Sequence, residues 1–320
     1  SPTGSCQSSG KSTQPLTFVR ITSMDDITDD GYYLIGGYGV KEHFWLMKGD
    51  ASSKKENYLA AWKPDVFSDI LNIGTEQEKY VWQILKRDDA YVLSNGSGYI
   101  YNKLDKKKNA TNYLVIESKE FTKWDILFEE DGTARIHNAS SSEYYLGFND
   151  YDDYCYFGNY KKTGSAEITL YIYKLATDFS QIPGIAESPA NGERITITTG
   201  NILPTPEFTG QSPDNFLLHN GDIAPDDGLA SFTVTTAADG AFLLKDADGL
   251  YLQYSLNTSG NETKWQIYNG HIATFEKTPR YILFDEVENR FGVYSSNDAI
   301  KIFSTNSYVY FQPIGAEPTS

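Results

Sequence analysis

One short phrase of residues recurs four times along this chain of 320 residues. Each copy has a Trp or Phe with an apolar residue two places on, then a short alternating segment, then an aromatic-aliphatic pair beside Gly or Pro. The four copies begin at Trp82, Trp124, Phe232 and Trp265, and they fall into two pairs. A phrase repeated at this spacing predicts repeated structural units that pack on one another. It carries no recurring nucleophile, metal cluster or phosphate loop, so it describes a scaffold.

The residues between the phrases are typical of β-strands. Residues 168–173 and 195–198 alternate aliphatic with polar or aromatic side chains, as expected when one face of a strand is buried. Asp-Gly and Asn-Gly pairs, which favour tight hairpin turns, separate such segments at short intervals. The 24 Tyr and 17 Phe also suit strands better than helices. The sequence therefore predicts an all-β protein.

The spacing of the phrases narrows the fold. Trp82 and Trp124 lie 42 residues apart (124 − 82), and Phe232 and Trp265 lie 33 apart (265 − 232). A degenerate opening unit before each pair gives three units in each half. Three such units of four strands each are typical of a β-trefoil. We expect two tandem β-trefoil-like barrels, and the alternative is a pair of β-sandwiches.

Composition indicates the domain boundaries. Residues 176–189 contain Pro and Gly and lack a sustained apolar period, so we interpret them as a linker. This linker separates a first domain at 16–175 from a second domain at 190–314. Residues 1–15 are rich in Ser, Thr, Gly and Pro and are expected to form a flexible tether, and residues 315–320 a C-terminal tail. Whether further domains follow residue 320 is left open.

The charge of the chain argues against nucleic acid as a partner. The formal net charge is −16 and the pI is about 4.6, and such a surface repels phosphate backbones. One basic cluster interrupts the acidic composition. It contains Lys103, Lys106, Lys107 and Lys108. We interpret it as a solvated hairpin tip rather than a docking patch. No apolar stretch approaches the roughly 20 residues that a membrane span requires.

Motifs at the ends of each half carry a resemblance. Residues 19–22, 26–27 and 31–35 read Val-Arg-Ile-Thr, Asp-Ile and Gly-Tyr-Tyr-Leu-Ile, and segments 156–160 and 168–174 close the first half. Segments 290–294 and 300–303 repeat the close in the second half, where the opening element is missing. These motifs resemble secreted, often multidomain, β-trefoil-like accessory modules of Bacteroidetes and gut Firmicutes, mostly of unknown function. The resemblance implies an exported, surface-displayed module and specifies no ligand.

No catalytic motif is visible. The sequence contains no Gly-x-Ser-x-Gly, no P-loop and no Gly-x-Gly-x-x-Gly. The four histidines stand far apart, and we interpret them as surface or strand residues. They are His43, His137, His219 and His271. We therefore assign no catalytic residue and expect the protein not to be an enzyme.

Pairs of neighbouring aspartates are frequent. Neighbours on a strand point to opposite faces and cannot flank one sugar as the two carboxylates of a glycosidase do, so we interpret the pairs as turn residues. Calcium is the one cofactor considered, and the weak candidate ligands are Asp150, Asp152 and Asp153, whose oxygens are dense.

The remaining aromatic residues suggest a binding surface. Trp45 and Trp62 have no counterpart in the repeats, so we expect them to be exposed, with Asp65 nearby to bond hydroxyl groups. Flat aromatic faces stack on sugar rings. Tyr151 and Tyr154 form a second such group. The alternative is that both tryptophans only cover the end of a barrel.

These observations predict a non-catalytic, exported bacterial surface protein that binds carbohydrate. A protein-interaction module of a surface complex and a cryptic glycan hydrolase are the alternatives, so the expected partner is a glycan or a surface protein. We expect the protein to be secreted or displayed on the outer surface, with Cys6 as a candidate lipid-attachment site. Whether Cys6 pairs with Cys155, which ligand binds and which oligomer forms are left open.

Overall fold

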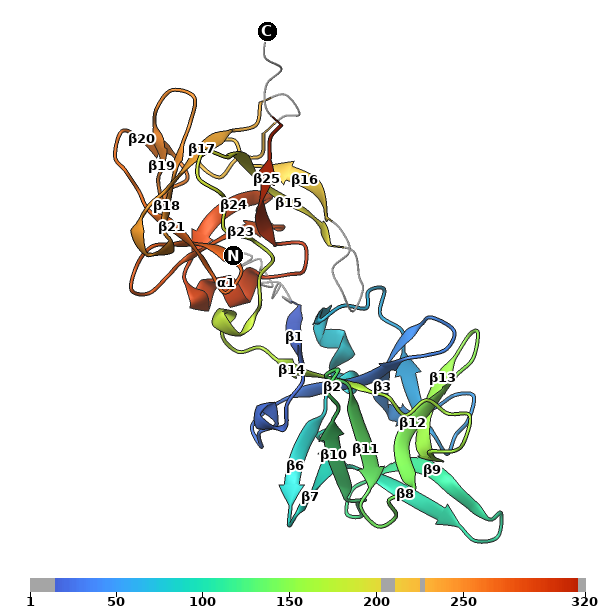
Figure 1. Cartoon of the computed structure of the whole chain (residues 1–320). Coiled ribbons are helices and arrows are strands. Elements are labelled where there is room, and N and C mark those ends of the chain that lie inside the picture. Colours follow the sequence, from blue (N-terminus) through green and yellow to red (C-terminus); the bar gives the residue numbers. More distant parts are fainter. Residues whose placement is uncertain (1–14, 203–210, 225–227, 316–320) are drawn as a thin grey trace, which may run out of the picture.

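A computed structural model describes residues 15–202, 211–224 and 228–315 of the chain (Figure 1). The expected tether, residues 1–15, and C-terminal tail, residues 315–320, each have only one residue within these ranges. Cys6 lies outside them. The described residues form an all-β protein with two antiparallel sheets, one in each half. Figure 1 shows the first sheet at the lower right and the second at the upper left. The all-β class that the sequence predicts is confirmed.

The first sheet has fourteen strands. They are β1 (Leu16–Ile21), β2 (Tyr33–Tyr38), β3 (Phe44–Ala51), β4 (Leu59–Trp62), β5 (Ile70–Ile73), β6 (Gln83–Arg87), β7 (Ala90–Ser94), β8 (Tyr99–Asp105), β9 (Ala110–Glu117), β10 (Trp124–Phe128), β11 (Ala134–Asn138), β12 (Tyr144–Asp150), β13 (Cys155–Lys161) and β14 (Tyr171–Leu175). Their order is β5-β1-β14-β2-β3-β4-β13-β12-β11-β10-β7-β8-β9, with β6 paired to β7.

The second sheet has eleven strands among the described residues. They are β15 (Arg194–Ile202), β16 (Gln211–Phe216), β17 (Phe232–Thr236), β18 (Phe242–Lys245), β19 (Tyr251–Leu252), β20 (Thr258–Ser259), β21 (Trp265–Tyr268), β22 (His271–Thr274), β23 (Tyr281–Asp285), β24 (Arg290–Tyr294) and β25 (Val309–Pro313). The order is β16-β15-β17-β18-β21-β22-β23-β24, with β25 on β15 and β19 on β18.

Helical structure is short in the described ranges. It comprises α1 (Ser296–Ile302) and the 3-10 turns η1 (Met24–Asp26), η2 (Thr75–Tyr80), η3 (Phe179–Gln181) and η4 (Ala238–Gly240). In neither sheet does the ladder order return to its first strand. Closed barrels are therefore not confirmed by the ladders, and the sandwich-like alternative fits two such sheets.

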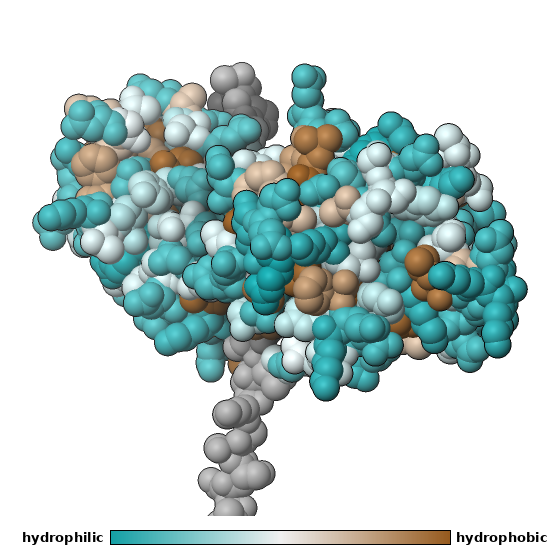
Figure 2. Space-filling model, turned by 90° about the horizontal axis from the view of Figure 1, so that it is seen from below, coloured by the Kyte–Doolittle hydropathy of each residue, from teal (hydrophilic) through white to brown (hydrophobic). Residues whose placement is uncertain are grey.

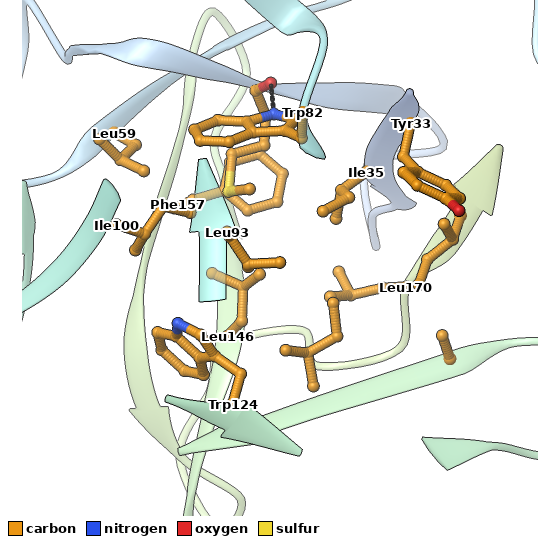
Figure 3. Packing of buried hydrophobic residues seen from close by; sticks show 14 of the residues in the cluster. Tyr33, Ile35, Leu59, Trp82, Leu93, Ile100, Trp124, Leu146, Phe157 and Leu170 are labelled. Atoms are coloured by element: carbon orange, nitrogen blue, oxygen red, sulfur yellow. Dashed lines mark hydrogen bonds between the residues drawn. The ribbon is translucent and has the colours of Figure 1, made fainter. Parts of the chain in front are cut away.

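The repeated phrases supply the core of each sheet, as predicted. Trp82, Trp124 and Trp265 are fully buried, and Phe232 is 2% exposed. The residue two places after each aromatic lies on the same face of its strand, because side chains alternate along a strand. Figure 3 shows Trp82 and Trp124 at opposite ends of the first core, with Leu93 between them. The Trp82 indole N–H donates to the carbonyl of Met47 at 3.0 Å, as the dashed line marks.

Residues 176–189 pack between the two halves. Phe179 and Ile182 are fully buried in a hydrophobic cluster that also contains Ile70 of β5 and Phe303 of the second half. The backbone N–H of Thr305 donates directly to the side-chain oxygen of Asn72 at 2.6 Å. The segment that the composition marks as a linker is therefore part of a shared core.

Candidate functional site

The turn between β12 and β13 presents two tyrosine rings to solvent. The backbone N–H of Tyr151 donates to the carbonyl of Tyr154 at 2.9 Å and closes the turn. Tyr151 is 44% exposed, and Tyr154 is half-buried. Because paired strands hold both ends of the turn, the sheet positions the rings. The structure thus brings together the pair that the sequence suggested.

A third ring, that of Tyr156, lies nearly parallel to these two. The ring centroids of Tyr151 and Tyr154 are 4.9 Å apart, and both lie near Tyr156, at 5.9 Å and 6.2 Å. The interplanar angles are 20°, 25° and 20°. Because the three separations are similar, the rings form a triangle instead of a column. We call these three rings, together with Tyr58 and Tyr113, the tyrosine patch.

Tyr58 extends the patch towards β9. Its ring centroid lies 4.7 Å from that of Tyr156 and 5.6 Å from that of Tyr113. Tyr58 belongs to the loop between β3 and β4, and the backbone N–H of Leu114 donates to the carbonyl of Asn57 in this loop at 3.0 Å. That bond attaches the loop to β9, the last strand of the ladder. Three parts of the first half therefore converge at the patch.

Polar and charged groups surround the rings. Burial raises the pKa of the Tyr58 and Tyr156 hydroxyls, so both stay protonated and can donate as well as accept hydrogen bonds. The Lys54 ammonium lies 5.9 Å from the centroid of the Tyr154 ring. Lys41 pairs with Asp152 at 3.1 Å beside the same turn. Charges of both signs therefore border the aromatic surface.

The expected exposure of Trp45 is wrong. Trp45 is 7% exposed, and its indole N–H donates to Oδ1 of Asp150 at 3.0 Å. The backbone N–H of Lys41 donates to Oδ2 of the same carboxylate at 3.3 Å. Asp150 therefore joins the β2–β3 turn to the β12–β13 hairpin. Trp45 stays out of reach of a ligand because its polar edge is used to hold these two hairpins together.

Trp62 is only half-buried, but it is not a free aromatic face. Its ring packs on that of Tyr80 with centroids 5.0 Å apart and planes tilted by 34°. The indole also packs against a buried cluster that includes Phe44 and Leu46. Asp65 is exposed in the following loop. These contacts favour the alternative in which Trp62 covers the core.

The three candidate calcium ligands do not form a cation site, because two of them already bond other protein groups. Asp150 accepts the two hydrogen bonds described above, Asp152 pairs with Lys41, and Asp153 is exposed. Within residues 15–202, 211–224 and 228–315, no three His, Cys, Asp or Glu side chains come together as a metal site would require.

Cys155 is buried in β13, and burial raises the pKa of its thiol.

Sequence reasoning missed three members of the tyrosine patch. Tyr156 was assigned to a closing motif, and Tyr58 and Tyr113 stand alone in their segments. The signal in the sequence is the density of Tyr in this segment, where residues 151, 154, 156 and 160 are all Tyr. Tyr58 joins the patch only because its loop bonds β9 far along the chain, and the sequence around Tyr58 does not indicate this contact.

A cavity lies apart from the patch. Its volume is about 310 Å³, and it is lined by Leu16, Phe18, Tyr32, Val81 and Asn95 among others. Its walls are mainly apolar. The Asn95 side chain already bonds the backbone around it, with Oδ1 accepting from two N–H groups and Nδ2 donating to a carbonyl. The Asn95 amide is therefore already engaged, whereas the Glu78 and Gln83 side chains also line the cavity.

Comparison with known proteins yields little. No family model matches the chain, and no curated protein matches it. A solved structure described as "Structure and mode of action of a mosquitocidal holotoxin" matches with a TM-score of 0.36 and 11% identity, over 91% of this chain and 35% of that one. The chain thus spans about a third of the length of that protein. A likeness at this level assigns neither a fold family nor an activity.

The outer surface is mostly hydrophilic on the face that Figure 2 shows, where hydrophobic residues lie in small separate groups. The described parts of the chain contain no helix with the length and hydrophobicity needed to span a bilayer.

Proposed function

We propose that this protein is a non-catalytic carbohydrate-binding protein and that the tyrosine patch is its binding site. The observation that carries the proposal is the stacked pair of rings of Tyr151 and Tyr154 at a solvent-facing turn, with the buried ring of Tyr156 nearly parallel beside them. Aromatic faces stack on the apolar faces of sugar rings, and neighbouring polar groups fix the orientation of the hydroxyls.

The patch is also ordered before any ligand arrives. Tyr156 is 7% exposed and sits within β13, so the sheet fixes its position. The rings of Tyr151 and Tyr154 stack on each other, and this contact restricts the rotamers of the exposed pair. A site with little side-chain motion to lose binds with a smaller entropic cost. This rigidity favours a binding function over a flexible turn without a role.

A trefoil arrangement of the first sheet belongs to the same proposal. Three single-residue pairings support it, two of them isolated bridges and one the β10–β7 pairing. Each joins the start of one strand pair to the second strand of the preceding pair. They are Trp82 with Tyr33, Trp124 with Tyr91 and Leu170 with Ala134. Together with the hairpin ladders they link β14, β2, β6, β7, β10 and β11 in a ring. The β12–β13 hairpin is then one of three equivalent projections from that ring.

Residues of the second half support an equivalent arrangement there. Ile195 pairs with Phe232, and Phe242 pairs with Trp265, at positions that match the pairings of Trp82 and Trp124. Two tandem trefoil-like domains are therefore the arrangement we propose. Export from a bacterial cell and display on its surface, with Cys6 as a possible anchor point, rest on the resemblance of the sequence motifs alone.

The test is a glycan array with the full chain, followed by titration of the bound glycans with intrinsic fluorescence as the readout. We expect Tyr151→Ala and Tyr154→Ala each to weaken binding about tenfold, in line with the loss of an aromatic contact. Tyr268→Ala is the matched control, because Tyr268 is 43% exposed and lies in the second half.

Equal losses for Tyr268→Ala and Tyr151→Ala would place the site elsewhere. Absence of binding to any glycan on the array, with capture of a protein partner through the first half, would support the assembly role instead.

A further inference from the structure

Six lysines gather beside the tyrosine patch of this strongly acidic protein. They are Lys103, Lys106, Lys107, Lys108, Lys161 and Lys162, and all six are exposed. Among the described residues, the ion pairs of the first half involve other cations, such as Lys41, Lys48 and Lys123. We call the six residues the lysine cluster. Its charge stands out against a net charge of −16 for the whole chain.

The lysines of the two segments meet around Tyr144. Lys161 lies opposite Tyr144 in the β12–β13 ladder, and its ammonium is 5.8 Å from the centroid of the Tyr144 ring. The Tyr144 hydroxyl lies 3.3 Å from Oγ1 of Thr111, which follows the turn that carries Lys106, Lys107 and Lys108. The β8–β9 turn and the end of β13 are therefore adjacent.

The lysine cluster is continuous with the tyrosine patch. Lys103 lies opposite Tyr113 in the β8–β9 ladder, and Tyr113 packs on Tyr58 at 5.6 Å. Strand β12 runs from Tyr144 at the cluster to Asp150 at the tyrosine turn. Its 7 residues span about 23 Å at the rise of a β-strand. The two groups thus mark the ends of one strip along the β12–β13 hairpin, at the right of Figure 1.

We propose that this strip binds an anionic polysaccharide. Sugar rings stack on the tyrosine patch, and carboxylate or sulfate groups further along the same chain meet the lysine cluster. The inference rests on the proposed function, because it names the class of glycan for the same site. It also changes the interpretation of the β8–β9 turn from a solvated hairpin tip to a contact surface.

A polyanion of low charge density fits this surface better than nucleic acid does. DNA carries about one charge per 1.7 Å of helix axis, whereas a polyuronate carries one carboxylate per sugar. The acidic remainder of the protein repels both, but repulsion beyond about 8 Å is largely screened at physiological ionic strength. A sparsely charged chain lying along the strip therefore reaches the lysines with less opposition.

The experiment compares two polymers that share one backbone. The affinity of the full chain is measured for polygalacturonate and for its fully methyl-esterified, uncharged form, and chondroitin sulfate, whose charge density is close to that of a polyuronate, serves as the sulfated probe. We expect at least about tenfold tighter binding to a charged polymer, weakening between about 50 mM and about 200 mM salt. A preference for polygalacturonate supports carboxylate recognition, and a preference for chondroitin sulfate supports sulfate recognition.

Charge variants locate the effect. The triple variant Lys106→Gln, Lys107→Gln, Lys108→Gln should weaken binding of the charged polymer about tenfold, because each exposed ionic contact contributes modestly. The matched control is Lys63→Gln, Lys119→Gln, Lys277→Gln, which removes the same charge from three exposed lysines elsewhere. The control should leave affinity unchanged.

Three outcomes would overturn the inference. Equal affinity for the charged and esterified polymers, with tyrosine-dependent binding to neutral glycans on the array, overturns this inference and leaves the proposed function intact. Failure on the array as well overturns both. Tighter binding to a single-stranded DNA oligonucleotide than to either charged polysaccharide would assign the strip to nucleic acid instead.

Discussion

Acidification from about pH 7 to about pH 5 is expected to destabilise the junction between the two halves, because a histidine is buried there in its neutral form. His271, at the start of β22, is 3% exposed, and its Nε2 lies 2.7 Å from the carbonyl oxygen of Ile182. The ring packs against Phe179, Tyr281 and Tyr308. Nε2 therefore carries the proton that is donated to the carbonyl, and the aromatic surroundings offer no counter-charge to an imidazolium.

The magnitude follows from the two pKa values of this histidine. Burial lowers the pKa of His271 from 6.5 to about 4, against a smaller opposing effect of the bond to Ile182. Below pH 6.5 the unfolded chain binds a proton that the folded chain excludes until about pH 4, so stability falls across this window as the pH falls. The full loss is about 3 kcal/mol, of which about 2 kcal/mol falls between pH 7 and pH 5.

Neighbouring titratable groups do not reverse the sign. Burial raises the pKa of Tyr281 and of Tyr308, so both stay neutral throughout the window. Asp178, on the segment that packs against His271, has its pKa lowered by the hydroxyl and backbone N–H of Ser180, and stays ionised. Its charge can offset only part of the cost, because it is engaged with Ser180 and Ser296.

The measurement is urea-induced unfolding at both pH values, followed by tryptophan fluorescence. The wild-type protein should lose about 2 kcal/mol between pH 7 and pH 5 through this residue, and His271→Gln, which keeps a donor for the Ile182 carbonyl, should lose that dependence. His219→Gln is the control, because His219 is exposed. The reasoning fails if His271→Gln shows the same pH dependence as the wild type, or if the imidazole titrates near 6.5 in the folded protein by NMR.

Further predictions concern the core and the junction. Trp82→Ala should lower the free energy of unfolding by about 3 to 5 kcal/mol in a urea titration, because it empties a fully buried site; a loss below about 1 kcal/mol would show that the repeat aromatic is not a core residue. Phe179→Ala should cost about 3 kcal/mol and make residues 176–189 cleavable in limited proteolysis, and an unchanged digest would contradict a packed junction. Gly184→Ala should be destabilising by about 2 kcal/mol in the same titration, since a methyl group there would collide with the backbone carbonyl of Gly270, and wild-type stability would show that these backbones can separate.

The repeated aromatic residues could be predicted as core because two independent regularities agree on them. A Trp or Phe with an apolar residue two places on places both side chains on one face of a strand, and recurrence at the same point of each unit excludes a chance arrangement. Trp82, Trp124 and Trp265 are fully buried as a result. The single pairings between distant strands, such as Tyr33 with Trp82, could not be predicted in the same way, because nothing in the local sequence marks them.

The burial of Trp45 could not be predicted from the sequence. Trp45 lacks a repeat counterpart, which suggested a surface position, yet its indole bonds Asp150, 105 positions along the chain. Whether such a residue is buried depends on which hairpins contact each other in the folded protein. Tyr151 and Tyr154 were identifiable because both lie on one turn, and a turn between paired strands is exposed whatever lies elsewhere.

In segment 176–189 the composition predicts where the strands are interrupted but not how the segment packs. Pro and Gly correctly predicted an interruption of the strands, because neither residue favours a sheet interior. Composition carried no information on the packing of the segment. The N–H of Gly184 donates to the carbonyl of Asn269 at 2.9 Å, and that of Ala186 donates to the carbonyl of Gly270 at 2.7 Å. Glycine permits this close approach of two backbones. These bonds attach the segment to the second half, and Phe179 and Ile182 of the same segment share a hydrophobic cluster with Ile70 of the first half, so the residues that interrupt the strands join the two halves.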